Sequence, residues 1–244
     1  MTHRCHQQQF LFRFSRDGER WLYWLFQARK RYELCVLNYV VTSNHIHLLV
    51  QDRGVGEIAA AMQLIAGRTA QEYNQRKGRR GAFWEDRYHA TAVDGERYLA
   101  ECLVYIDMNM VRAGVVKHPA DWQHGGYLEL QSPPRRYRLI DSDDLLRLIG
   151  CRDVMEMREL HRHWVEEALK RGDLQRDERW SKSLAVGRPE FVKRFQKDLG
   201  VTARYRTVIE QTDFSSLRDD SGSYYVDFAG KNIAPSPEND DLKG

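Results

Sequence analysis

Residues 44–50 read Asn-His-Ile-His-Leu-Leu-Val, and the organisation of the chain can be worked out from them. Successive side chains of a β-strand point to opposite faces, so His45 and His47 would share one face while Ile46 and Leu48 pack behind them. The strand would therefore bring two imidazoles into one small volume. Because neutral imidazole nitrogens bind divalent metals, the pair is a candidate metal site.

A second informative stretch, residues 105–112, reads Tyr-Ile-Asp-Met-Asn-Met-Val-Arg. Residues four apart in a helix lie one above the other, so Tyr105 and Asn109 would share a stripe, with Arg112 close to it one turn further on. If this helix crosses the face of the histidine strand, two ring nitrogens, an amide oxygen and a phenol converge. Such a set suits metal-assisted attack on a phosphodiester by tyrosine.

Each of these residues also has a plain structural interpretation. His-x-His pairs occur by chance in soluble proteins, and histidines alone would suit zinc or nickel equally well. A tyrosine in a helix commonly fills the edge of a core, and a phenol with a pKa of about 10 is a weak nucleophile until it is activated. Tyr88 and Tyr98 are further candidates, but neither stands four residues before Asn109.

Three motifs in this order resemble the REP-associated tyrosine transposases, relatives of the single-tyrosine insertion-sequence transposases in the HUH (His-hydrophobic-His) endonuclease superfamily. They are the histidine stretch, Phe83-Trp84 followed by Arg87-Tyr88, and the tyrosine stretch continued by Ala113-Gly114. The resemblance covers roughly residues 5–120. The family usually has proline before the Asn-His pair and after the helix asparagine, where this chain has Ser43 and Met110.

The resemblance implies a metal-dependent single-stranded DNA endonuclease and strand transferase. Tyr105 would attack a phosphodiester and leave a 5′-phosphotyrosine and a free 3′-hydroxyl, while His45, His47 and Asn109 would hold Mg²⁺ or Mn²⁺. The partners would be single-stranded DNA and DNA hairpins of repetitive extragenic palindromes. The protein would act as a monomer or a homodimer.

Two other functions remain open on the sequence alone. The chain could be a domesticated protein that binds DNA hairpins without cutting them, although the intact histidines, tyrosine and asparagine argue against this. It could also be a metallo-phosphodiesterase that uses an activated water in place of the tyrosine.

Hydrophobic patterns predict strands and helices in the order β-α-β-β-α-β-α over residues 1–118, which would form the catalytic domain. This order fits a ferredoxin-like or RNA-recognition-motif-like α+β fold, an antiparallel sheet with helices on one face. The resembled family has the same fold. The predicted strands are 10–14, 34–41, 44–50 and 82–93, and the predicted helices are 19–32, 55–73 and 98–110, with a turn at Asp17-Gly18.

Beyond residue 118 the signals are weaker. Residues 119–212 would form a connection and a helical extension, with helices at 142–149, 153–171 and 190–199, and could contact a DNA hairpin. Residues 213–244 would be a flexible tail, because acidic and small residues dominate there.

Local rather than global charge indicates a nucleic-acid partner, since the formal net charge is only +3 over 244 residues. Basic side chains concentrate in a glycine-punctuated loop at residues 76–81, next to aromatic residues. Single strands are held by basic grooves with aromatic stacking platforms. The candidate DNA contacts are Arg68, Arg76, Lys77, Arg79, Arg80, Phe83, Trp84, Arg87 and Arg112.

The remaining composition favours a protein of a reducing compartment. Four cysteines at positions 5, 35, 102 and 151 lie far apart in the sequence, which argues against a disulfide framework or a zinc site. The N-terminus lacks an apolar core, and no apolar run reaches membrane-spanning length. We therefore expect a cytoplasmic, nucleoid-associated protein without membrane partners.

Overall fold

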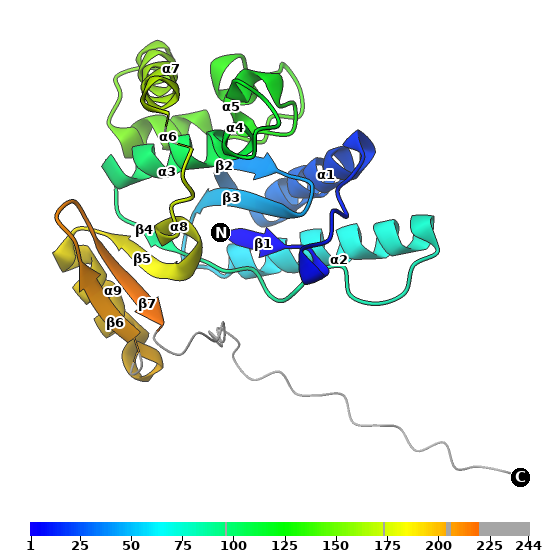
Figure 1. The fold of residues 1–244 in the computed structure, drawn as a ribbon, viewed down its shortest axis with the longest axis horizontal. Helices are drawn as coiled ribbons and strands as arrows, with labels where there is room; N and C mark the ends of the chain where they lie inside the picture. Colours follow the sequence, from blue (N-terminus) through cyan, green and yellow to red (C-terminus); the bar gives the residue numbers. More distant parts are fainter. Residues whose placement is uncertain (96, 173, 204–205, 220–244) are drawn as a thin grey trace, which may run out of the picture.

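The structure is a computed structural model that describes residues 1–95, 97–172, 174–203 and 206–219. It contains two β-sheets with helices packed around them (Figure 1). The strands are β1 (Thr2–Arg4), β2 (Cys35–Val41), β3 (His45–Gln51), β4 (Ala92–Val93), β5 (Ser183–Gly187), β6 (Arg206–Glu210) and β7 (Ser215–Asp219). The helices are α1 (Ser15–Tyr32), α2 (Glu57–Lys77), α3 (Arg97–Asp107), α4 (Asn109–Arg112), α5 (Gly126–Gln131), α6 (Ser142–Ile149), α7 (Val154–Arg171), α8 (Arg179–Lys182) and α9 (Pro189–Leu199).

The first sheet has the strand order β1-β3-β2, and both pairs are antiparallel. β2 and β3 form the predicted hairpin. Residues 84–89 lie along the outer side of β1 through isolated bridges at Thr2–His89 and Cys5–Trp84. The α+β class is therefore confirmed, and the observed order β1-α1-β2-β3-α2-β4-α3 matches the predicted order, although its first strand is β1 and not residues 10–14.

Helices flank this sheet on two sides, where the sequence had predicted one-sided cover. In Figure 1, α1 and α2 lie on one side of the sheet, and α3 with α5, α6 and α7 lies on the other. All seven residues of β2 are buried, as expected of a strand covered on both faces. On α1 the inward stripe is Trp21, Leu25 and Ala28, which are fully buried at the predicted helical spacing.

Two predicted strands are wrong. Residues 10–14 are irregular, because the consecutive residues Leu11 and Phe12 are both buried while Phe10 and Phe14 face solvent, so no alternating strand face exists. Asp17 and Gly18, predicted as a turn, lie inside α1. Residues 82–91 make only isolated bridges, and β4 is confined to residues 92 and 93.

The second sheet was not predicted. Its order is β4-β5-β7-β6, and β4 pairs with β5 in parallel while the other pairs are antiparallel. α9 covers it through Val192 and the partly buried Phe191 and Phe195. β7 falls inside the stretch predicted to be a flexible tail, and residues 220–244 lie outside the described residues.

The main core extends from Cys5 to Val186 and includes residues of α3, α6 and α7. The C-terminal extension therefore packs into the same hydrophobic core as the first sheet. All four cysteines are free and buried. Among the described residues, no helix combines the length and apolar character that crossing a bilayer requires.

Candidate active site

The two histidines of β3 lie on one face of the first sheet, as the strand period predicts. Their ring centroids are 5.0 Å apart and the ring planes are nearly perpendicular. In the antiparallel register Thr2 stands opposite His47 and Arg4 opposite His45, so β1 adds a hydroxyl and a guanidinium beside the imidazoles.

Hydrogen bonds on Nδ1 fix the orientation of each imidazole. Nδ1 of His47 lies 2.9 Å from Thr2 Oγ1, and Nδ1 of His45 lies 2.7 Å from the amide oxygen of Asn44. Because an amide oxygen only accepts, Nδ1 of His45 carries the proton and the lone pair of this neutral ring is on Nε2. Such tethering of the second ring nitrogen is how metal-binding histidines are oriented.

Both histidines stay neutral at physiological pH. The pKa of His45 is lowered to about 4, first by burial and then by the positive charges of Arg4, Arg176 and Arg112. Burial, followed by the neighbouring His45, also lowers the pKa of His47 well below its usual value. Neutral imidazoles are the form that binds metal.

Tyr105 is buried on α3 and reaches the histidines across the face of the sheet. Its ring meets His47 edge to face, with 5.7 Å between the centroids. The guanidinium carbon of Arg112 lies 4.2 Å from the centre of the tyrosine ring, and Nη2 of Arg112 donates to the Tyr105 carbonyl at 2.6 Å. The arginine therefore stacks on the phenol and holds its backbone.

Burial raises the pKa of Tyr105, while the positive charges of Arg112 and Arg176 act in the opposite direction. The phenol is thus protonated at neutral pH and lies in a positively charged surrounding. Tyr98 instead donates its hydroxyl hydrogen to the carbonyl of Asp213. Neither Tyr98 nor Tyr88 lines the cavity that contains the histidines.

The helix carrying Tyr105 is interrupted, where the sequence predicted one continuous helix. α3 ends at Asp107 and α4 begins at Asn109. Asn109 nevertheless lines the same cavity as Tyr105 and His45. Tyr105 and Asn109, four residues apart in the sequence, therefore both face this cavity.

A cavity of about 280 Å³ collects these groups, all from one chain. Sequence reasoning missed Arg4 and Arg176, which add two positive charges. The only local signal for Arg4 was its two-residue step from Thr2 on a short strand, and Arg176 follows α7, far from every motif. The lining residues are Thr2, Arg4, Gln8, Asn44, His45, His47, Tyr105, Asn109, Arg112, Ala113, Leu174 and Arg176.

The donor chemistry of the cavity fits a divalent cation. It offers two neutral imidazoles, each tethered through Nδ1, and the amide of Asn109. Three protein donors leave coordination positions free for a substrate oxygen.

Another cluster, Cys35, Asp141 and Asp144, brings three potential metal-binding atoms close together. Asp144 there pairs with Arg147 at 2.6 Å and with Arg53 at 3.2 Å. Burial, with the neighbouring carboxylates, raises the pKa of the Cys35 thiol to about 12, so the thiol is protonated. These contacts account for the cluster as a network of ion pairs.

The proposed aromatic platform is wrong for Phe83 and needs correction for Trp84. Phe83 is 2% exposed, within the main core. One face of Trp84 is stacked on His3 at 3.9 Å, and its Nε1 donates to the Ala66 carbonyl. A stacking platform needs accessible ring faces, and residues 82–91 do not form the strand that was predicted to carry these rings.

The predicted basic contacts divide into two groups. Arg112 lies in the cavity, Arg76 is paired with the buried Asp17, and Arg79 donates to Asn74 and to the carbonyl of Ala82. The exposed members of the set are Arg68, Lys77, Arg80 and Arg87.

A family model and one solved structure match this chain. Residues 5–109 match the model of a family described as "Transposase IS200 like", and the matched range holds both histidines, Tyr105 and Asn109. A solved structure, "Structure of the REP associates tyrosine transposase bound to a REP hairpin", matches with a TM-score of 0.42 and 17% sequence identity over 51% of this chain and 73% of that chain. No curated protein matches the sequence.

Proposed function

We propose that this chain is a metal-dependent single-stranded DNA endonuclease and strand transferase in which Tyr105 is the nucleophile. The observation that carries the proposal is the meeting of Tyr105 with His45, His47 and Asn109 in one cavity of one chain. The match of residues 5–109 to the IS200-like transposases supports the same class of reaction.

His45, His47 and Asn109 would hold the divalent cation, for which we propose Mg²⁺ or Mn²⁺. When bound, the ion polarises the scissile phosphate. The Nδ1 partners Thr2 and Asn44 keep each ring turned for this role. Imidazoles with depressed pKa values offer their lone pairs over the whole physiological range.

The bonds that form and break in the reaction involve only the Tyr105 phenol and the phosphodiester. The Tyr105 oxygen forms a bond to phosphorus and loses its proton, and the bond to the 3′ oxygen breaks, so that this oxygen leaves as a hydroxyl after gaining a proton. The 5′-phosphotyrosine preserves a phosphodiester bond, and a 3′-hydroxyl can later attack it and rejoin the strand. No external energy source is required.

Three arginines in the cavity, Arg4, Arg112 and Arg176, would bind the phosphate oxygens and stabilise the charge that develops on them. The charges of Arg112 and Arg176 also oppose the effect of burial on the Tyr105 pKa. We further propose that the preferred substrates are hairpins of repetitive palindromes with an unpaired flank, as the resemblance to the REP-associated transposases implies.

The test is incubation of the protein with a labelled hairpin that has single-stranded flanks, in the presence of Mn²⁺, followed by denaturing electrophoresis. We expect a protein–DNA adduct that Tyr105→Phe abolishes and that Tyr98→Phe, the same change on the same helix, leaves intact. Cleavage without an adduct would support the water-using phosphodiesterase. Binding without cleavage would support the hairpin-binding protein.

A further inference from the structure

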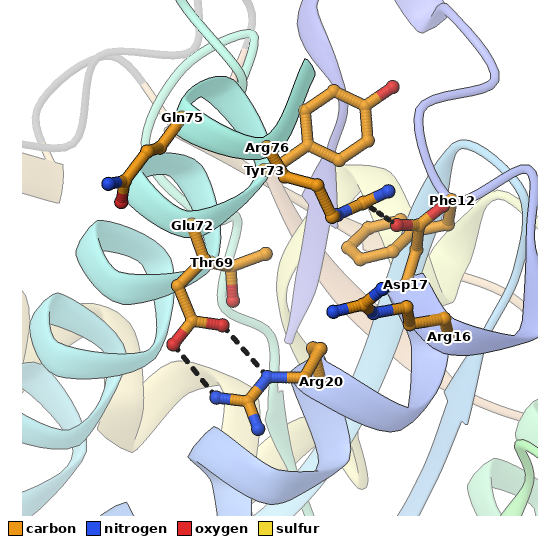
Figure 2. Close-up of a pocket in the computed structure, with 9 residues that line it drawn as sticks. All are labelled: Phe12, Arg16, Asp17, Arg20, Thr69, Glu72, Tyr73, Gln75 and Arg76. Atoms are coloured by element: carbon orange, nitrogen blue, oxygen red, sulfur yellow. Dashed lines mark hydrogen bonds and ion pairs between the residues drawn. The ribbon is translucent and has the colours of Figure 1, made fainter. Parts of the chain in front are cut away.

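A second cavity, of about 370 Å³, opens between α1 and α2 (Figure 2). Three arginines and two carboxylates line it together with the aromatic rings of Phe12 and Tyr73, so its walls carry an excess of positive charge. The lining residues are Phe12, Arg16, Asp17, Arg20, Thr69, Glu72, Tyr73, Gln75 and Arg76.

Two ion pairs account for both carboxylates of this cavity. Arg20 donates two hydrogen bonds of 2.8 Å to Glu72, and Arg76 pairs with the buried Asp17 (Figure 2). In this view the Arg16 side chain lies between the two pairs. Among the described residues, no carboxylate lies within ion-pair distance of Arg16. Its positive charge is therefore available to an anion.

A buried hydroxyl in the wall also lacks a partner. Thr69 lines the cavity and is 5% exposed, yet its Oγ1 makes no hydrogen bond with any described residue. A buried polar atom without a partner costs free energy, so such atoms are rare unless a ligand or a water satisfies them. This hydroxyl is therefore available to hydrogen-bond a ligand in the cavity.

Two exposed aromatic residues lie two positions before and two positions after Phe12, which lines this cavity. Phe10 is 68% exposed and Phe14 54% exposed, although large apolar side chains are commonly buried. The Nζ atom of Lys77 lies 4.8 Å from the centre of the Phe14 ring. Asp17 accepts a hydrogen bond from the Phe14 backbone, so the ion pair with Arg76 also fixes the position of this ring.

The segment that carries these rings joins the two cavities. Gln8 lines the candidate active site, and Phe12, four residues later, lines the cavity between α1 and α2. Four extended residues span at most about 14 Å, so a strand leaving the active site needs few nucleotides to reach the second cavity. The segment is anchored to the histidine hairpin, because Asn44 Nδ2 donates to the Gln8 carbonyl and Phe12 donates to the Ser43 carbonyl.

We propose that Phe10, Phe14 and the cavity containing Arg16, together named the N-terminal track, bind the unpaired DNA strand next to the cleaved phosphodiester. Bases stack on Phe10 and Phe14, and a backbone phosphate lies at Arg16. The combination of a basic groove and aromatic platforms is the way in which proteins hold single strands without reading their sequence. This inference rests on the proposed function, since it takes the active site as the point from which the strand departs.

The test measures binding of an end-labelled single-stranded oligonucleotide of about twelve thymidines, a length within the range of known single-strand sites. EDTA is present so that no cleavage contributes. We expect Phe10→Ala with Phe14→Ala to raise the Kd at least about tenfold, since each stacked base contributes roughly a five- to hundredfold effect. Arg16→Ala should raise the Kd and reduce the slope of log K against log salt by about 0.7, the value for one phosphate of a single strand.

Matched controls separate this effect from general loss of charge or aromatic surface. Arg31→Ala removes an exposed arginine from the other end of α1, and Tyr137→Ala removes another highly exposed ring. Both should leave the Kd within about twofold, because such surface changes are usually small.

Three results would overturn the inference. The first is an unchanged Kd after the Phe10→Ala, Phe14→Ala and Arg16→Ala substitutions. The second is an equal loss of affinity for a blunt hairpin without unpaired flanks. The third is complete competition by inorganic phosphate, which would leave only a small-anion site. None of these depends on cleavage. A protein that binds thymidines through the track but forms no adduct with Mn²⁺ would instead refute the proposed function.

Discussion

The ring of Tyr105 on α3 contacts the ring of His47 on β3 edge to face, with 5.7 Å between their centroids. This contact places the phenol beside the imidazole pair within a single chain. Both rings are buried, so their relative position is set by the packing of α3 on the sheet.

Replacing either histidine of the proposed metal site should abolish cleavage and spare DNA binding. We expect His45→Ala or His47→Ala to lower the rate of adduct formation at least about a hundredfold, since changes to the residues behind a metal ligand already cost up to that much. Hairpin affinity should stay within about twofold, because phosphate contacts supply most of it. His163→Ala, on the exposed side of α7, is the control. Normal cleavage by the histidine variants would refute the metal assignment.

Arg112 should act on the phenol as well as on the DNA. Because its charge opposes the rise in the Tyr105 pKa, Arg112→Ala should move the alkaline rise of the rate to higher pH. The rate at neutral pH should fall about a hundredfold, as for other charge-stabilising donors. Arg112→Lys retains the charge but loses the planar stack and should be intermediate. The rate of single-turnover adduct formation, measured across pH, tests this. An equal shift in the pH–rate profile of Arg80→Ala would contradict it.

A buried pair behind the active site should stabilise the tyrosine helix. Nε2 of His161 on α7 donates to Asp107 Oδ2 at 2.7 Å, and Asn38 Nδ2 donates to Asp107 Oδ1 at 3.0 Å. Removing one hydrogen-bond partner of a buried group typically costs roughly 1–3 kcal/mol, because Asp107 would keep only the bond from Asn38. His161→Ala should therefore lower the free energy of unfolding in urea by about that amount, whereas the exposed His163→Ala should change it little. A loss below about 1 kcal/mol would show that the pair is not important for stability.

Stability should fall as the solution becomes mildly acidic. Burial lowers the pKa of His3 from 6.5 to about 4, so the unfolded chain binds a proton at a pH where the folded chain does not. The stabilisation is complete above pH 6.5 and is lost as the pH falls towards 4, by roughly 2–3 kcal/mol for His3 between about pH 7 and pH 4.5. Urea unfolding at both values measures it. His3→Gln, which cannot take up a proton, should show a smaller decrease than the wild type, and an equal decrease would contradict the assignment.

The site residues could be predicted where their spacing matches the side-chain period of a strand or a helix. The two-residue step of His45 and His47 and the four-residue step from Tyr105 to Asn109 are properties of a strand and a helix, and tertiary packing preserved both. Arg4 and Arg176 could not be found this way, since they reach the cavity from segments far apart in the sequence. Their role depends on packing that no short window contains.

The fold was predictable where elements are long and amphipathic. α1 and α2 have clear helical stripes, and β2 and β3 are rich in branched and aromatic residues. Phe10, Phe12 and Phe14 misled the prediction because alternation in sequence does not require alternation in burial when the backbone leaves the extended conformation. β5 was missed because all its residues are buried, so its short apolar run carries no periodic signal.

The parallel rung between β4 and β5, where Ala92 faces Ala185 and Val93 faces Val186, ties two distant parts of the chain together. The chain enters α3 only a few residues after β4, so the segment that leads into the helix bearing Tyr105 is paired with a strand from the C-terminal half. A fragment ending at residue 118 would leave β4 without this neighbour and with the unpaired backbone groups of a strand edge. The C-terminal half therefore supports the place where the tyrosine helix begins.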